Sequence, residues 1–239
     1  MITNYSPNFS TPSRNINKIK YIIFHYTGMR SQNEAINRLL NVKSKVSCHY
    51  FIKKNGKIIL MVPGNYQAWH AGKSNWKNDK SLNKSSIGIE ISNKGHDHGY
   101  EKFSNNQILS LIKLVKLLIK KYKINKKNIL GHSDISIERK KDPGEKFPWQ
   151  FLSKKGIGIW HNIDQTKLKK LRREKITVFE RSKGIKLLKN IGYFNNKLND
   201  KKHSKLIKSF QRRFRQELVD GIMDLECLII AEKLRKLYK

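Results

Sequence analysis

The sequence predicts an α/β (α+β) protein followed by a small C-terminal domain of three helices. Residues 20–25 are apolar on both faces, which is typical of a central strand, and residues 86–92 alternate apolar and polar side chains. Residues 104–122 carry one apolar stripe at helical spacing. From residue 165 onward, lysine and arginine increase, and the apolar positions predict three short amphipathic helices at about 175–190, 202–216 and 223–238.

Cap and turn signals place the remaining elements. Ser31 and Glu34 form a capping-box pair that predicts the start of a helix. Asn55-Gly56 separates two runs with strand character and favours a type I′ hairpin. The further elements expected are therefore a helix at 31–42 and strands at 46–53, 57–62 and 125–132.

The composition limits the classes of partner. A formal charge of +33 favours anionic partners such as nucleic acid, anionic lipid or bacterial cell wall. Most of the cations are lysines scattered on helix faces, and no groove-reading motif or aromatic-basic platform accompanies them, so we expect no specific nucleic-acid partner. No apolar run approaches the ~20 residues needed to span a bilayer. Cys48 and Cys227 have no metal-type spacing, and we expect two reduced thiols.

The first 17 residues read as an irregular polar arm. They contain no apolar segment of the kind found in secretory signals, so we expect a cytoplasmic protein unless it is exported by a route that leaves no such mark. The oligomeric state is not readable from the sequence.

Three side chains are candidate metal ligands. His25 and His132 each end a predicted strand, and Asp142 lies in a polar loop before Pro143, which biases Asp142 toward an extended conformation. A histidine in the position of His25 is more often a core residue when taken alone. Together, two imidazoles and one carboxylate suit Zn²⁺ and leave a fourth tetrahedral position for water, as in catalytic zinc sites.

Two further residues are candidates for the chemistry. Glu90 is an acid in the middle of a predicted strand beside Gly88, a position that is costly on an inner strand unless the carboxylate meets a cation or moves a proton. Lys140 lies close to Asp142 in sequence, and its ammonium can stabilise an oxyanion formed by attack on an amide carbonyl. Either residue can serve in proton transfer.

Five stretches in this order resemble the AmpD/AmiD-type N-acetylmuramoyl-L-alanine amidases. They are 23–27 (IFHYT), 47–50 (SCHY), 68–72 (AWHAG), 86–90 (SIGIE) and 131–144 (GHSDISIERKKDPG). The resemblance implies a mixed central β-sheet flanked by helices, with zinc at His25, His132 and Asp142 and with Glu90 and Lys140 as catalytic partners. It implies hydrolysis of the amide between N-acetylmuramic acid, intact or 1,6-anhydro, and L-alanine of the stem peptide, in cell-wall turnover or muropeptide recycling. The residues that we expect to bind substrate are Tyr26, Trp69, His70, Ala71 and Asn83.

The C-terminal segment is similar to three-helix peptidoglycan-binding modules, through residues 209–214 and 219–224. We therefore expect an N-terminal arm at 1–17, a zinc amidase domain at 18–163 and a helical peptidoglycan-binding-like domain at 164–239. A C-terminal extension packed on the first domain is the alternative. For the whole chain, the alternative function is a non-catalytic protein that binds peptidoglycan.

Overall fold

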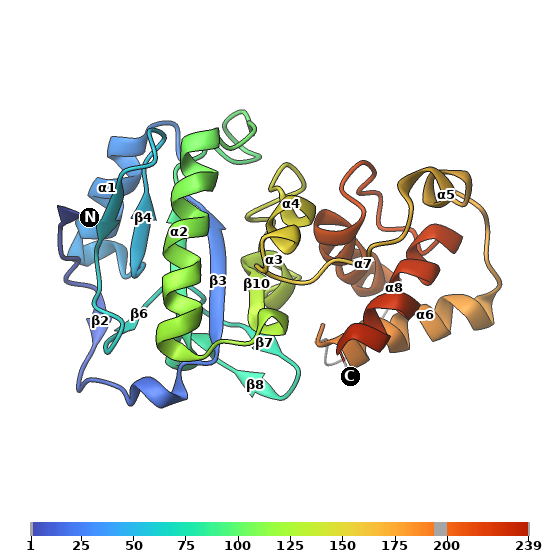
Figure 1. Cartoon of the computed structure of the whole chain (residues 1–239), viewed down its shortest axis with the longest axis horizontal. Coiled ribbons are helices and arrows are strands. Elements are labelled where there is room, and N and C mark those ends of the chain that lie inside the picture. The colour runs from blue at the N-terminus through green and yellow to red at the C-terminus, as the bar shows by residue number, and fades with distance from the viewer. Residues whose placement is uncertain (1, 194–199, 239) are drawn as a thin grey trace.

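A computed structural model describes residues 2–193 and 200–238, and its centre is a mixed six-stranded sheet (Figure 1). The strands of this sheet are β1 (Ile2–Thr3), β3 (Tyr21–Tyr26), β4 (Tyr50–Ile52), β5 (Ile58–Leu60), β9 (Ser86–Ile91) and β10 (Ile129–Gly131). Their order is β1-β5-β4-β9-β3-β10, and every neighbouring pair is parallel except β4 with β5. The predicted α/β class with a mixed central sheet is confirmed.

The strand β3 lies between two parallel neighbours, which explains its continuous apolar run. Its residues Ile22, Ile23 and Phe24 are fully buried. The register pairs His25 with Glu90 on β9, and Glu90 in turn with Phe51 on β4. Because side chains on one cross-strand row point to the same face of a sheet, His25 and Glu90 share a face.

Helices cover both faces of the sheet. On the face of Phe51 lies α1 (Gln32–Leu40), which packs Ala35 and Leu39 against it. The other long helix of this region, α2 (Asn105–Tyr122), lies along the sheet in Figure 1. It begins at a complete capping box in which Ser104 and Gln107 satisfy each other's backbone. The face with α1 therefore carries His25 and Glu90.

Smaller elements complete the first part of the chain. Two short antiparallel pairs stand outside the main sheet, β2 (Phe9–Ser10) with β6 (Gln67–Ala68) and β7 (Asn75–Trp76) with β8 (Asp79–Lys80). Short helices α3 (His132–Ile135) and α4 (Trp149–Lys154) follow β10, and 3₁₀ turns lie at 16–18, 42–44, 82–85 and 126–128.

The C-terminal helices stand beside β10 at one end of the molecule (Figure 1). They are α5 (Gln165–Lys170), α6 (Val178–Ile191), α7 (Asp200–Phe214) and α8 (Leu225–Tyr238). The last three correspond to the three predicted helices. Their apolar core is continuous with that of the sheet, because Tyr193 packs edge-on against Trp76, with ring centroids 5.1 Å apart. The predicted boundary between 163 and 164 stays a proposal.

Three local predictions were wrong. The first 17 residues are not an irregular arm, because β1 pairs with β5 in the central sheet and β2 pairs with β6. The hairpin after β4 is not a type I′ turn, because Gly56 has a positive φ of 83° and Asn55 does not. A turn from Lys53 to Gly56 ends on Gly56 in the left-handed region, the arrangement of a three-residue hairpin loop. His132 also does not end a strand; it is the first residue of α3. Among the described residues, the helices are too short or too polar to cross a membrane.

Candidate metal centre

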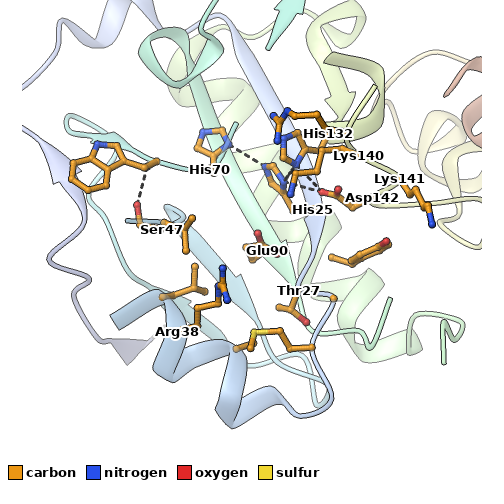
Figure 2. Close-up of a pocket in the computed structure, with 18 of the residues that line it drawn as sticks. His25, Thr27, Arg38, Ser47, His70, Glu90, His132, Lys140, Lys141 and Asp142 are labelled. Carbon is orange, nitrogen blue, oxygen red and sulfur yellow. Dashed lines mark hydrogen bonds and ion pairs between the residues drawn. The ribbon is translucent and has the colours of Figure 1, made fainter. Parts of the chain in front are cut away.

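Three side chains from distant parts of the chain converge at one point (Figure 2). His25 comes from the end of β3, His132 from the start of α3, and Asp142 from the loop that follows α3. The Nδ1 atoms of His25 and His132 lie 3.0 Å apart, and each lies 3.0 Å from Oδ2 of Asp142. All three side chains are buried.

The contacts of the Nε2 atoms of His25 and His132 show that the Nδ1 atoms face the point where the three side chains meet. Nε2 of His132 lies 3.1 Å from the carbonyl oxygen of Ala71, which can only accept, so this nitrogen carries the proton. Nε2 of His25 lies 3.0 Å from Nδ1 of His70. Burial and the neighbouring His132 lower the pKa of His25 to about 4, so its ring is neutral at pH 7.

The three facing atoms suit a divalent cation. Burial acts to raise the pKa of Asp142, but the imidazoles of His132 and His25 hold that pKa well below its usual range. Two imidazole lone pairs and one carboxylate oxygen in contact repel one another unless a positive charge lies among them. Two nitrogens and one oxygen are the donor set of catalytic zinc sites, which keep one position open. The residues present therefore fit zinc.

Close packing of the backbone holds Asp142 against α3. The amide of Ser133 donates to the carbonyl of Asp142 over 2.8 Å. Gly131 makes this approach possible, because a Cβ at that position would lie 2.7 Å from Cδ of Pro143. The run Gly131-His132 and the run Asp142-Pro143 are thus parts of one local structure.

A cleft of about 420 Å³ opens over the candidate ligands, and Glu90 and Lys140 both line it. Burial, together with the charge of Asp142, raises the pKa of Glu90 well above its usual range, while Lys140 acts in the opposite direction. Oε2 of Glu90 is enclosed and has no hydrogen-bond partner among the described residues. An enclosed carboxylate oxygen without a partner, beside the candidate ligands, is suited to receiving a proton from a bound molecule.

The five residues expected to bind substrate divide into two groups. Tyr26, Trp69 and His70 line the cleft, whereas Ala71 and Asn83 are not among its lining residues. The hydroxyl of Tyr26 is 2.9 Å from Nδ1 of His96. The indole of Trp69 donates to Ser10 over 2.8 Å. Contact with substrate stays a prediction for all five.

Sequence reasoning missed several cationic side chains of the cleft. Arg38 from α1 and Arg139 and Lys141 from the loop after α3 line it, with Asp97 as a further acid. Arg139 and Lys141 flank Lys140 within residues 131–144, one of the five stretches that resemble the amidases. Arg38 carried no signal, because it looks like any basic residue on the polar side of a helix.

A second missed feature joins the C-terminal helices to α3. Asp134 accepts from the amide of Gly131 over 2.8 Å, from the hydroxyl of Tyr193 over 2.8 Å and from Nη1 of Arg213 over 2.6 Å. Arg213 also donates to the carbonyl of Ile129 over 3.0 Å. Arg213 and Asp134 are each 1% exposed. This ion pair, which we call the α7–α3 clamp, reaches the segment that carries His132.

Comparison with known proteins gives a consistent result. The family model described as N-acetylmuramoyl-L-alanine amidase matches residues 15–145. The N-acetylmuramoyl-L-alanine amidase AmiD of Escherichia coli is 34% identical over 235 residues, covering 92% of this chain and 84% of that protein. The 1,6-anhydro-N-acetylmuramyl-L-alanine amidase AmpD of Haemophilus influenzae is 41% identical over 107 residues, which are 44% of this chain and 56% of that protein.

Solved structures extend the similarity over the whole chain. A complex of E. coli AmiD with anhydro-N-acetylmuramic acid-L-Ala-D-γ-Glu-L-Lys superimposes with a TM-score of 0.81 at 33% identity, covering 96% of this chain and 92% of that one. AmpDh3 of Pseudomonas aeruginosa in complex with anhydromuramic pentapeptide superimposes with a TM-score of 0.82 at 29% identity, covering 100% and 99%. Both superpositions thus include the C-terminal helices.

Proposed function

The chain belongs to the family of N-acetylmuramoyl-L-alanine amidases, and we propose that it hydrolyses the amide between the lactyl group of N-acetylmuramic acid and L-alanine, with zinc held by His25, His132 and Asp142. The observation that carries the proposal is the convergence of three lone-pair donors, 3.0 Å apart, at the floor of a cleft. Two relatives of similar fold were solved with anhydromuramyl peptides bound, which supports a muropeptide as substrate.

Each catalytic role follows from the position of a side chain. Zinc, when bound, supplies an acidified water and a Lewis acid for the amide carbonyl. Glu90 takes the proton that water loses as its oxygen bonds to the carbonyl carbon. Lys140 stabilises the negative charge that builds up on the carbonyl oxygen. As the C–N bond breaks, Glu90 returns the proton to the alanine nitrogen. The new muramic carboxyl group then gives up its own proton to the amine, so that a carboxylate and an ammonium group leave.

The cationic side chains of the cleft suit the product and the peptide. Four basic side chains line the cleft, against three acidic ones: Arg38, Arg139, Lys140 and Lys141 against Glu90, Asp97 and Asp142. A muropeptide carries free carboxylates, and its hydrolysis releases one more, so a positive cleft favours both binding and the developing charge.

For residues 164–239 we propose a helical peptidoglycan-binding-like unit. A cell-wall pull-down would test it, with the full chain and with variants that replace surface lysines of that segment.

The function is tested by mass spectrometry of the products from intact and 1,6-anhydro muropeptides. We expect free stem peptide from the unmodified protein, loss of the product with a chelator, and recovery with zinc. Glu90→Gln and Lys140→Ala should each lower kcat by about 100-fold or more, as expected for a lost proton-transfer group and a lost oxyanion partner. Both variants should keep zinc at the wild-type ratio.

A matched control is Glu34→Gln, which changes an exposed acid on α1. It should leave kcat unchanged. Binding to muropeptide without any released peptide, in the presence of zinc, would favour the non-catalytic alternative. Full activity of Lys140→Ala would refute the role assigned to Lys140.

A further inference from the structure

We propose that a single short segment, His70-Ala71, orients both imidazole ligands of the metal, and that Asn83 holds this segment in place. The three residues are then positioning residues, and this role stands beside the prediction that they contact substrate. The inference rests on the proposed function only in assuming that a metal binds between His25 and His132. The hydrogen bonds that support it are made by the Nε2 atoms of His25 and His132, opposite the Nδ1 atoms that face the metal.

The first imidazole, His25, is fixed through a chain of three hydrogen bonds. The hydroxyl of Ser86 donates to the carbonyl of Leu82 over 2.6 Å. Its oxygen therefore accepts from Nε2 of His70, 3.1 Å away. With its proton on Nε2, His70 has a bare Nδ1 that accepts from Nε2 of His25 over 3.0 Å. The Nδ1 lone pair of His25 is thereby left for the metal.

The second imidazole, His132, is fixed by the next residue of the same segment. Its Nε2 donates to the carbonyl oxygen of Ala71 over 3.1 Å, which again leaves Nδ1 for the metal. That carbonyl also accepts from Nη2 of Arg139 over 3.2 Å, so both of its lone pairs are used. A shift of this segment would therefore turn both rings together.

Asn83 holds the segment itself through two hydrogen bonds. Oδ1 of Asn83 accepts from the amide of His70 over 3.1 Å and from the amide of Ala71 over 2.7 Å. The carbonyl of Asn83 accepts from Nη1 of Arg14 over 2.8 Å. The ring of His70 lies directly on Gly88, where a Cβ would come within 2.3 Å of its Cγ. Figure 2 shows the ring of His70 directed at His25, and a dashed line marks the contact between them.

Groups that orient metal-bound histidines raise metal affinity by about 10–100-fold. The experiment measures the zinc dissociation constant by competition with a chelator and the visible spectrum of the cobalt-substituted protein. His70→Leu removes the acceptor for His25, and we expect zinc binding about 10–100-fold weaker and an altered cobalt spectrum. His70→Asn keeps an acceptor oxygen close to the position of Nδ1 and should recover part of the affinity.

Asn83→Leu provides a second, independent variant at a partly exposed position, and it should weaken zinc binding in the same direction. The matched control is His161→Asn, because His161 is also buried and its Nδ1 accepts from the amide of Ile163, not from a candidate metal ligand. It should leave the zinc affinity and the cobalt spectrum unchanged, even where it lowers the melting temperature.

The outcomes separate the two proposals. Wild-type zinc affinity and an unchanged cobalt spectrum in both His70→Leu and Asn83→Leu would overturn the positioning role while leaving the amidase intact. If the unmodified protein neither binds zinc more tightly than His25→Ala nor cleaves a muropeptide, the proposed function itself fails. A weaker site in both variants, with His161→Asn unaffected, supports the inference.

Discussion

Replacing Arg213 by methionine should break the α7–α3 clamp while keeping most of the volume of the side chain. The guanidinium contacts Asp134 over 2.6 Å and the carbonyl of Ile129 over 3.0 Å, and it stacks on Trp149 with its centre 4.2 Å from the ring. Methionine can preserve the contact with Trp149. It cannot satisfy the carboxylate or the carbonyl.

The expected loss in the free energy of unfolding is about 3–5 kcal/mol. Removing one partner of a buried ion pair typically costs about that much, because the other charge stays buried without compensation. Asp134 keeps two donors, Gly131 and Tyr193, which moderates the penalty. The carbonyl of Ile129 also loses the donor Nη2 of Arg213, which adds to the penalty. For a chain of 239 residues, the melting temperature should fall by about 6–20 °C.

The assay is urea unfolding at pH 7, combined with the zinc dissociation constant. Arg215→Met is the matched control, because Arg215 is equally buried but pairs with Asp220 and Asp224 inside the C-terminal helices. Both variants should be destabilised, whereas only Arg213→Met should also weaken zinc binding. Adding Asp134→Asn to Arg213→Met should recover part of the loss, because no unpaired charge remains.

Two results would refute this reasoning. A loss below about 1 kcal/mol in Arg213→Met would show that the buried pair contributes no more than a surface pair does. Strictly additive effects of Arg213→Met and Asp134→Asn would show that the two side chains are not energetically coupled.

Two further predictions concern the packing of the site and the response to acid. Gly131→Ala should lower the free energy of unfolding by about 1–3 kcal/mol and weaken zinc binding, because its Cβ would meet the rigid ring of Pro143 at 2.7 Å. Gly184→Ala should be neutral or stabilising, because the atoms nearest to its Cβ belong to the flexible side chain of Met223. Equal effects in the two variants would contradict the argument. Burial lowers the pKa of His161 to about 4, so between pH 6.5 and 4 only the unfolded chain takes up its proton, and this residue should remove about 2 kcal/mol of stability between pH 6.5 and 5. His161→Asn should lose that much less on acidification in urea unfolding, and an unchanged pH slope would count against a buried neutral ring.

The elements that could be predicted from the sequence are those with a strong period or a cap. The two-sided apolar run before His25 identified a central strand, and the Ser104 cap identified the start of α2. The candidate ligands could be identified because His25 and His132 each follow an apolar run and Asp142 stands before Pro143. Their meeting point depends on parallel pairing of β3 with β10, which periodicity alone does not reveal.

The parts that could not be predicted depend on partners far away in sequence. Arg213 stands in a helix rich in lysine and arginine, where a buried cation has the same local pattern as an exposed one. His70 belongs to a loop whose composition suits a ligand site, and only the fold shows that its ring lies behind His25. Local sequence records which groups are present, but not which side of a ring faces the cleft.

The pairing of His25 with Glu90 on neighbouring strands has a consequence for how this protein can diverge. Their backbones stand about 4.8 Å apart, the spacing that hydrogen bonding imposes on any sheet. The separation between the proposed metal ligand His25 and the proposed proton acceptor Glu90 is therefore set by the pairing of two central strands. Loops around the cleft can change in length and charge without altering the spacing of these two backbones.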